Sequence, residues 1–291
     1  MIPRFSLTRP GSIEEALDAF DRAADDVAYL AGGTELLQVM KMGLAQFTTL
    51  IDLKGIAELK GISVLPVGTL RIGATSTHRD IERSPLVRER AAGLARLESR
   101  IANVRVRNAG TLGGNLAFAE PHSDPATFLL ACGASLTLAG RAGRRELEVA
   151  EFAVGPLATA REQDEVLVEI LIPAARPGEG RAYDKIAFFE RPAASVAVRL
   201  TVVDGSIADA TVAVGSLTDT PVVVTGAGGA LQGAPVLGDG FAVALDAAAM
   251  ALGGVEAMAD LNGSADYKRH LAGVLLGRAA GVAVREATAH A

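Results

Sequence analysis

Two short glycine-rich stretches carry the residues best suited to bind a ligand. They read Ala31-Gly32-Gly33-Thr34-Glu35 and Thr111-Leu112-Gly113-Gly114-Asn115, and each follows β-like sequence. Paired glycines permit positive φ and let the backbone approach a ligand to hydrogen-bonding distance, which a Cβ would hinder. Two threonines add hydroxyl groups, and residues 35–41 are typical of a short helix whose N-terminus favours an anion. Together the stretches, with their exposed backbone N–H groups, predict a cradle for a diphosphate.

The spacing of these glycines excludes two common phosphate-binding motifs. A dinucleotide-binding Rossmann loop requires G-x-G-x-x-G, whereas Gly32 and Gly33 are adjacent and no third glycine follows at the required spacing. The Gly-Lys-Ser/Thr ending of a Walker loop is absent as well. Neither motif therefore explains the predicted cradle.

The composition limits what else the chain can do. Its 291 residues are 49% hydrophobic and carry a formal net charge of −6, which allows two compact domains and disfavours nucleic acid as a partner. The single cysteine, Cys132, lies in an apolar run and reads as a small buried hydrophobe. One Cys and four scattered His cannot ligate an iron–sulfur cluster or a structural zinc, so any such centre must belong to a partner. We identify no catalytic residue and no metal ligands.

The apolar segments predict neither secretion nor membrane insertion. The first residues lack the basic and apolar pattern of a secretory signal, so a cytoplasmic location is expected. The most apolar region, residues 241–259, contains Asp246 and Glu256 and is typical of an Ala-rich helix rather than a membrane span.

Periodicity and turn signals divide the chain into two domains. The first domain, residues 1–175, has lobes of about 1–57 and 58–175, and the second domain covers residues 176–291. A Pro- and Gly-containing linker at 174–180 spans the boundary between them. Helices are expected at 12–24, 35–41, 77–95, 126–132, 241–251 and 265–280. Strands are expected at 27–30, 48–53, 63–65, 70–74, 135–138, 146–149, 166–172, 195–203, 207–215 and 220–225, those between 63 and 172 in one mixed sheet.

Both glycine stretches, with their neighbours, resemble the FAD-binding loops of one family. Residues 30–37 followed by Met40-Lys41, and Arg107-Asn108 followed by residues 111–117, are similar to the two loops of the molybdenum hydroxylase flavoproteins. These are the medium subunits of bacterial heterotrimers related to xanthine dehydrogenase and carbon monoxide dehydrogenase. Further similar segments cover nearly the whole length, at residues 50–53, 70–74, 183–185 and 264–269.

The resemblance implies a fold and a set of cofactor contacts. The fold is α+β: a two-lobed FAD-binding domain of the vanillyl-alcohol-oxidase/PCMH type, then a smaller α+β domain with a three-stranded sheet and helices. The residues implied to wrap the FAD pyrophosphate are Tyr29, Leu30, Ala31, Gly32, Gly33, Thr34, Glu35 and Leu36. Those implied to contact the diphosphate and the flavin side are Thr111, Leu112, Gly113, Gly114 and Asn115. Further implied contacts come from Ile101, Asp124, Leu167, Val168 and Lys185.

Several of these residues have a plainer interpretation that stays open. Instead of binding the cofactor, Asp124 could serve simply as the N-cap of the helix that follows it, with Pro125 at the first helical position. Lys185 could be a solvated strand lysine. Ile101, Leu167 and Val168 could be core residues. Arg105 and Arg107 could face the diphosphate or solvent, and His122 is expected in a solvent-exposed loop rather than against the flavin.

The implied function is electron transfer within a larger complex. Substrate would be hydroxylated at a molybdopterin centre on a large subunit, and electrons would pass through two [2Fe–2S] clusters on a small subunit to the FAD of this chain and an external acceptor. A dimer of such heterotrimers is implied. The alternatives are a free-standing FAD oxidase and a non-catalytic assembly subunit that has lost flavin. Gln38 stands where many members of the family have Pro, and Thr34-Glu35 and Asn115 differ from the residues typical of carbon monoxide dehydrogenases, which disfavours carbon monoxide as the substrate.

Overall fold

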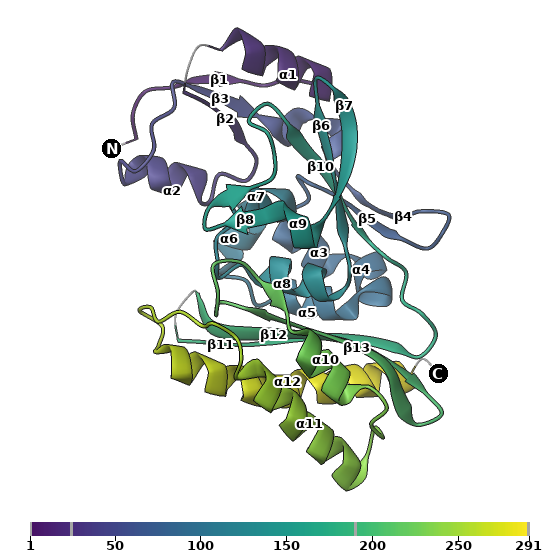
Figure 1. Cartoon of the computed structure of the whole chain (residues 1–291). Coiled ribbons are helices and arrows are strands. Elements are labelled where there is room, and N and C mark those ends of the chain that lie inside the picture. Colours follow the sequence, from purple (N-terminus) through teal and green to yellow (C-terminus); the bar gives the residue numbers. More distant parts are fainter. Residues whose placement is uncertain (1, 24–25, 189–190, 290–291) are drawn as a thin grey trace.

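Three larger β-sheets follow one another from the top to the bottom of Figure 1, with helices between and outside them. The computed structural model describes residues 2–23, 26–188 and 191–289. The expected α+β architecture, with two lobes followed by a smaller domain, corresponds to these three sheets.

The top layer is a three-stranded parallel sheet. Its strands, in spatial order, are β1 (Ser6–Thr8), β3 (Thr49–Asp52) and β2 (Val27–Leu30). Two helices accompany it, α1 (Ile13–Arg22) and α2 (Leu36–Lys41). Ser12 caps α1 by accepting a hydrogen bond from the Glu15 backbone N–H at 3.1 Å. The predicted helix near residue 12 and the strand, loop, helix and strand that follow it are thus confirmed.

The middle layer is a five-stranded sheet in which every pair is antiparallel. Its strands, in order, are β4 (Ile62–Val64), β5 (Leu70–Gly73), β10 (Val166–Ile172), β6 (Ser135–Gly140) and β7 (Gly143–Glu148). The mixed sheet expected from the sequence is wrong, because short hairpins join β4 to β5 and β6 to β7 and so force antiparallel pairing. A small hairpin, β8 (Ala153–Gly155) with β9 (Ala158–Thr159), follows the short helix α9 (Val149–Phe152).

Short helices fill the space beside this sheet. They are the two 3₁₀ helices η1 (Leu53–Gly55) and η2 (Ala57–Leu59), and α3 (His78–Arg83), α4 (Pro85–Arg90), α5 (Ala92–Glu98), α6 (Val104–Ala109), α7 (Leu112–Phe118) and α8 (Asp124–Ala131). The single helix expected over residues 77–95 is three helices. Ser84 caps α4 ahead of Pro85, and Ala91 leaves the helical region at φ −151°, so the chain turns at both points.

Helical structure surrounds the second glycine stretch, where β-like sequence had been expected. Asn103 accepts hydrogen bonds from the backbone N–H groups of Arg105 and Val106 at 3.0 and 3.2 Å and so begins α6. Thr111 then caps α7 by accepting from the Gly114 N–H at 3.0 Å. The two caps outweigh the β propensity of the valines in this segment.

The bottom layer is a four-stranded antiparallel sheet, β11 (Glu179–Ala187), β12 (Pro192–Val203), β13 (Ser206–Gly215) and β14 (Val222–Val223). Two helices, α10 (Thr225–Leu231) and α12 (Ala265–Ala289), pack on its outer face, and α11 (Gly238–Leu252) packs against both of them. The expected sheet of three strands is therefore wrong. The missed strand β11 starts inside the predicted linker, where Gly178 turns the chain at φ +69°. At Gly180 a Cβ would lie 1.9 Å from the Ala283 carbonyl oxygen, so this glycine lets α12 pack against the sheet.

Helix α8 lies between the middle and bottom sheets and joins their cores. Phe128 and Leu129 are buried in the same cluster as Ala197 of β12 and Ala213 of β13. Cys132, just after α8, is buried as predicted, and burial raises the pKa of its thiol to about 12. Helix α8 thus joins the second lobe to the C-terminal sheet, whereas β10 packs against the first lobe through Val166 and Val168.

Candidate functional site

The two glycine stretches lie against each other in the folded chain. A Cβ on Gly32 would lie 2.3 Å from the Ala109 carbonyl oxygen and 2.7 Å from Gly110 Cα, just before the second stretch. A Cβ on Gly114 would lie 3.4 Å from Ala31 Cβ and 3.9 Å from the Gly32 nitrogen. The predicted approach of the two stretches, which only glycine permits at Gly32, is therefore present.

The first stretch has four consecutive backbone N–H groups without a protein acceptor among the residues that the structure describes. Within the described ranges, the N–H groups of residues 32–35 donate to no protein acceptor, and Gly33 adopts φ +73°. On the second stretch, the N–H groups of Leu112 and Gly113 donate to the carbonyl oxygens of Ser76 and Ala74 at 3.1 and 2.9 Å. The expectation of exposed N–H groups on both stretches is thus wrong for the second, because residues just after β5 and at the start of α7 accept hydrogen bonds from its N–H groups.

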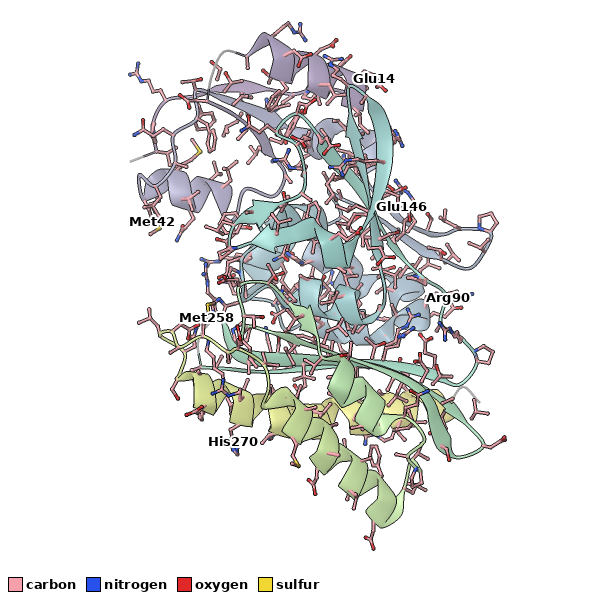
Figure 2. The ribbon with its side chains drawn as sticks, viewed as in Figure 1. Glu14, Met42, Arg90, Glu146, Met258 and His270 are labelled. Atoms are coloured by element: carbon pink, nitrogen blue, oxygen red, sulfur yellow. The ribbon has the colours of Figure 1, made fainter. Side chains whose placement is uncertain are left out.

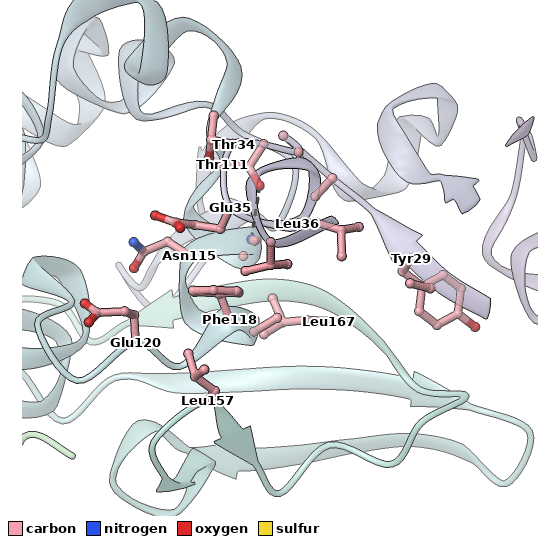
Figure 3. A pocket seen from close by; sticks show the side chains of 18 of the residues that line it. Tyr29, Thr34, Glu35, Leu36, Thr111, Asn115, Phe118, Glu120, Leu157 and Leu167 are labelled. Carbon is pink, nitrogen blue, oxygen red and sulfur yellow. Dashed lines mark hydrogen bonds between the residues drawn. The ribbon is translucent and has the colours of Figure 1, made fainter. Parts of the chain in front are cut away.

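The second stretch offers side chains instead. The buried Thr111 hydroxyl accepts from Gly114 N–H, which leaves its own proton to donate. Ser123 donates its hydroxyl to Asn115 Oδ1 at 2.6 Å, so the Asn115 amide nitrogen keeps its donors. The dashed line in Figure 3 marks the cap bond beneath Thr111, with Thr34 beside it.

A cavity of about 1660 Å³ opens beside the two stretches. It exceeds the roughly 300–1,000 Å³ of sites for drug-sized ligands and has room for an extended dinucleotide. The predicted site residues that line it are Tyr29, Ala31, Gly32, Gly33, Thr34, Glu35, Leu36, Ile101, Thr111, Gly113, Gly114, Asn115, Asp124 and Leu167. Figure 3 shows Tyr29 at one end of this cavity and Glu120 at the other.

Four predicted site residues lie outside this lining. Leu30, Leu112 and Val168 are buried in three separate apolar clusters. Leu167 and Val168 are neighbours in β10, so their side chains point to opposite faces and only Leu167 reaches the cavity. The fourth, Lys185, has a buried side chain that pairs with Asp124.

Asp124 is a hub of buried polar contacts. Its carboxylate accepts hydrogen bonds from the Tyr183 hydroxyl and from Lys185 Nζ, both in β11. Ser123, not Asp124, is the residue that precedes α8, so the predicted cap position is wrong by one residue. Burial, and then the Asp124 carboxylate, raise the pKa of Tyr183 well above its usual value. The two hydrogen bonds to Asp124 connect the cavity wall that contains this residue to the C-terminal sheet.

His122 stands in a charged cluster at the Glu120 end of the cavity, not in solvent as expected. Its Nδ1 lies 2.9 Å from Glu120 Oε1 and its Nε2 lies 2.8 Å from Asp260 Oδ2. Arg191 donates to Glu120 at 2.7 Å, and Lys268 donates to Asp260 at 2.5 Å. This cluster connects the second lobe to the C-terminal domain.

Contacts within this cluster shift the pKa values of its members. The hydrogen bond to Glu120 does most to raise the pKa of His122, and the Asp260 contact adds to it against the effect of burial. Burial would raise the pKa of Asp260, but the bonds from Lys268 and His122 outweigh it and lower that pKa to about 2. Burial would likewise raise the pKa of Glu120, which His122 and Arg191 instead lower. The cluster thus favours a protonated His122 between ionised carboxylates.

Sequence reasoning missed other lining residues, among them His78, Phe118, Leu157 and Arg161. Nothing local in the sequence distinguishes them, because they come from α3, α7, the β8–β9 turn and the segment before β10. Tyr29 was predicted, but its contacts were not: its hydroxyl donates to the Asp164 carbonyl oxygen at 2.8 Å. Burial raises the pKa of Tyr29, which keeps the hydroxyl a donor.

Residues 2–23, 26–188 and 191–289 contain neither a cluster of metal ligands nor a membrane-spanning helix. In these ranges no three His, Cys, Asp or Glu side chains come together to hold a metal ion. No helix in the same ranges is long and apolar enough to cross a bilayer.

The cavity and its donors suit a dinucleotide with a diphosphate. Unpaired N–H groups at residues 32–35 and the Thr111 hydroxyl can donate to phosphate oxygens. Apolar side chains such as Phe118 and Leu167, which face each other in Figure 3, can pack against a ring system. The residues present therefore fit FAD.

Comparison with known proteins identifies the same cofactor. Residues 3–175 match the family described as "FAD binding domain in molybdopterin dehydrogenase", and residues 190–283 match the "CO dehydrogenase flavoprotein C-terminal domain". The carbon monoxide dehydrogenase medium chain of Hydrogenophaga pseudoflava is 34% identical over 279 residues, which are 95% of this chain and 96% of that one. The nicotine 6-hydroxylase medium subunit of Paenarthrobacter nicotinovorans is 32% identical, with 95% of this chain and 96% of that subunit covered.

Solved structures share the fold over its whole length. Carbon monoxide dehydrogenase from Hydrogenophaga pseudoflava superposes with a TM-score of 0.92 at 35% identity, covering 98% of this chain and 99% of that one. Quinoline 2-oxidoreductase from Pseudomonas putida 86 gives a TM-score of 0.90 at 29% identity, covering 100% and 99%. The resemblance noted in the sequence and the expected fold class are confirmed. The chain belongs to the FAD-binding medium subunits of the molybdenum hydroxylase family.

Proposed function

We propose that this chain is the electron-transfer flavoprotein of a heterotrimeric molybdenum hydroxylase. The observation that carries the proposal is the meeting of both glycine stretches at one large cavity, within the segment that matches the FAD-binding domain. In this proposal residues 1–175 hold the cofactor. Residues 176–291 support one wall of the site, because Lys185 bonds to Asp124 and Asp260 bonds to His122.

The chain's part in the reaction is to bind and orient FAD. The free N–H groups of residues 32–35 and the Thr111 hydroxyl hold the diphosphate, while Ile101 and Leu167 pack against the flavin ring. When bound, FAD supplies the redox chemistry, accepting electrons from iron–sulfur clusters of a partner and delivering them to an external acceptor. No acid or base from the chain is required for that role.

Partner subunits follow from what this chain lacks. Cys132 is its one cysteine and is buried, so iron–sulfur clusters must come from another polypeptide. We propose a large molybdopterin-binding subunit and a small iron–sulfur subunit, assembled as a dimer of heterotrimers in the cytoplasm. Exposed apolar side chains at the cavity rim support a partner there: Met42 is 64% and Leu44 is 71% exposed, and Figure 2 shows Met42 pointing away from the ribbon.

Purification of the tagged chain from its natural host tests the proposal. We expect flavin absorption bands, one larger partner that contains molybdenum, and one smaller partner rich in cysteine. A colourless chain that takes up no added FAD would leave only a structural role in assembly. Turnover with oxygen by the chain alone, without partners, would instead establish a free-standing oxidase.

The substrate is proposed to be organic. Thr34-Glu35 and Asn115 depart from the loops typical of carbon monoxide dehydrogenases, although one of the relatives above is such an enzyme. Bleaching of the flavin band in the purified complex under carbon monoxide, without other donors, would contradict this part of the proposal.

A further inference from the structure

His78 is a buried histidine next to the glycine stretches. It opens α3 and is only 3% exposed, yet it lines the cavity. Its backbone N–H donates to the Gly110 carbonyl oxygen at 3.0 Å, and the preceding Thr77 forms a β-bridge with Thr111. These backbone contacts hold the imidazole beside the second stretch.

One edge of the His78 ring is engaged and the other faces the cavity. Nδ1 lies 2.6 Å from Glu98 Oε2, whereas Nε2 has no hydrogen-bond partner among residues 2–23, 26–188 and 191–289. A Cβ placed on Gly110 would lie 3.1 Å from His78 Cδ2 and 3.3 Å from Thr34 Oγ. Since Cδ2 is bonded to Nε2, the free edge of the ring and the Thr34 hydroxyl border the same space.

Burying the Glu98 carboxylate, the partner of His78, costs free energy. Glu98 is the last residue of α5 and is 0% exposed, so its carboxylate is removed from water at the helix end where the dipole disfavours a negative charge. Its other oxygen, Oε1, has no hydrogen-bond partner. Glu98 Oε2 is the acceptor at Nδ1, and a phosphate oxygen in the cavity would be the acceptor at Nε2.

The neighbouring arginines do not supply positive charge to this space. Arg107 directs its guanidinium to Glu82 and to the carbonyl oxygens of Ile101 and Ala102, at 3.2, 2.9 and 3.3 Å. Arg105 is exposed, and neither glycine stretch contains a cationic residue. Lys54 donates to the Ala31 carbonyl oxygen at 3.3 Å, beside the first stretch. The His78 ring lines the cavity beside the second stretch.

We propose that His78, positioned by Glu98, donates a hydrogen bond from Nε2 to the diphosphate of the bound dinucleotide, next to Thr34. This inference rests on the proposed function, because it requires the cradle to hold a diphosphate. It adds a contact from an imidazole nitrogen to a site built from backbone N–H groups and hydroxyls.

The test compares ligands with and without a diphosphate on the full chain freed of flavin. His78→Asn can still contact Glu98 but lacks the nitrogen that faces the cavity. A lost hydrogen bond to a charged group should raise the Kd of FAD, and of ADP as a competitor, by a similar factor of about 10 to 100. Riboflavin, which has no phosphate, should show no such loss. His78→Gln, whose amide nitrogen reaches further, should recover part of the affinity.

The matched control is His270→Asn, since His270 is exposed on α12 and lies far from the cavity in Figure 2. It should leave the Kd of FAD unchanged. Unchanged FAD affinity in a folded His78→Asn chain would overturn the inference, and so would a loss for FAD but not for ADP. Failure of the unaltered chain to bind FAD would count against the proposed function itself, which keeps the two failures apart.

Glu98 is tested as a positioning residue. Glu98→Gln keeps an oxygen for Nδ1 but removes the charge, so it should weaken FAD and ADP by a smaller factor than His78→Asn. Because Glu98 acts through the ring, the double variant should bind FAD no more weakly than His78→Asn alone. Additive losses would refute the positioning role, and the single Glu98→Gln variant still reports on the diphosphate contact if His78→Asn does not fold.

Discussion

Replacing Gly32 with alanine is the sharpest test of the cradle. The added Cβ would lie 2.3 Å from the Ala109 carbonyl oxygen and 2.9 Å from its carbonyl carbon, and both are backbone atoms that no side-chain rotation can move. Normal contact needs about 3.5 Å, so the two glycine stretches must separate by about 1 Å. Hydrogen bonds that both stretches make to one diphosphate cannot all survive such a shift.

The expected loss follows from those bonds. Each hydrogen bond to a charged group contributes about 1.5–3 kcal/mol, so losing one raises the Kd of FAD by roughly 10-fold to 100-fold and losing two by the square of that factor. The assay is titration of the flavin-free chain with FAD, followed by quenching of flavin fluorescence. The amount of FAD retained after desalting gives a second, independent measure.

The control is Gly277→Ala in α12, where a Cβ meets nothing within 4 Å. This change should leave FAD affinity as it is and raise the free energy of unfolding by about 0.5–1 kcal/mol, since glycine is unfavourable inside a helix. Thermal unfolding of flavin-free Gly32→Ala shows whether the chain still folds. A folded Gly32→Ala chain that binds FAD as tightly as the unaltered chain would refute the cradle.

Three further predictions concern the walls of the cavity. Asp124→Asn leaves the buried Lys185 without its charged partner and should lower the free energy of unfolding by about 3–5 kcal/mol in urea titrations, whereas no change would mean that solvent already satisfies the lysine. Tyr29→Phe removes the bond to the Asp164 carbonyl oxygen and should cost about 0.5–1.5 kcal/mol in the same assay; equal stability would show that the bond contributes nothing. The raised pKa of His122 means that its stabilising contribution is complete below about pH 6.5 and is lost as pH rises through the folded value. The free energy of unfolding, measured from pH 6 to 9, should therefore fall more steeply for the natural chain than for His122→Gln. Parallel curves for the two chains would contradict the raised pKa of His122.

Features encoded locally were predictable from the sequence. The first glycine stretch follows a strand and precedes a short helix, and the structure has β2, the turn and α2 in that order. The two stretches also meet as expected, because the glycine at position 32 allows such close approach. In β10 the alternation of side chains decides between Leu167 and Val168, a distinction that a sequence segment alone leaves open.

Features that depend on long-range pairing were not predictable. His122 contacts Asp260, which is 138 residues away, and His78 contacts Glu98 across two intervening helix breaks. The segment before the second glycine stretch has two β-branched valines, yet the Asn103 cap makes it helical. One capping side chain, which accepts two backbone hydrogen bonds, thus favours a helix where residue propensities point the other way.

Helix α8 has a consequence for how the chain unfolds. Its body shares one apolar core with Ala197 and Ala213 of the bottom sheet, and Asp124 at its start is bonded to Lys185 of the same sheet. A chain cut near residue 175 would expose that face of α8 to water and leave Asp124 without its partners. We therefore expect the two segments recognised as separate families by sequence to unfold as one cooperative unit, with residues of the C-terminal sheet contributing to the stability of the flavin site.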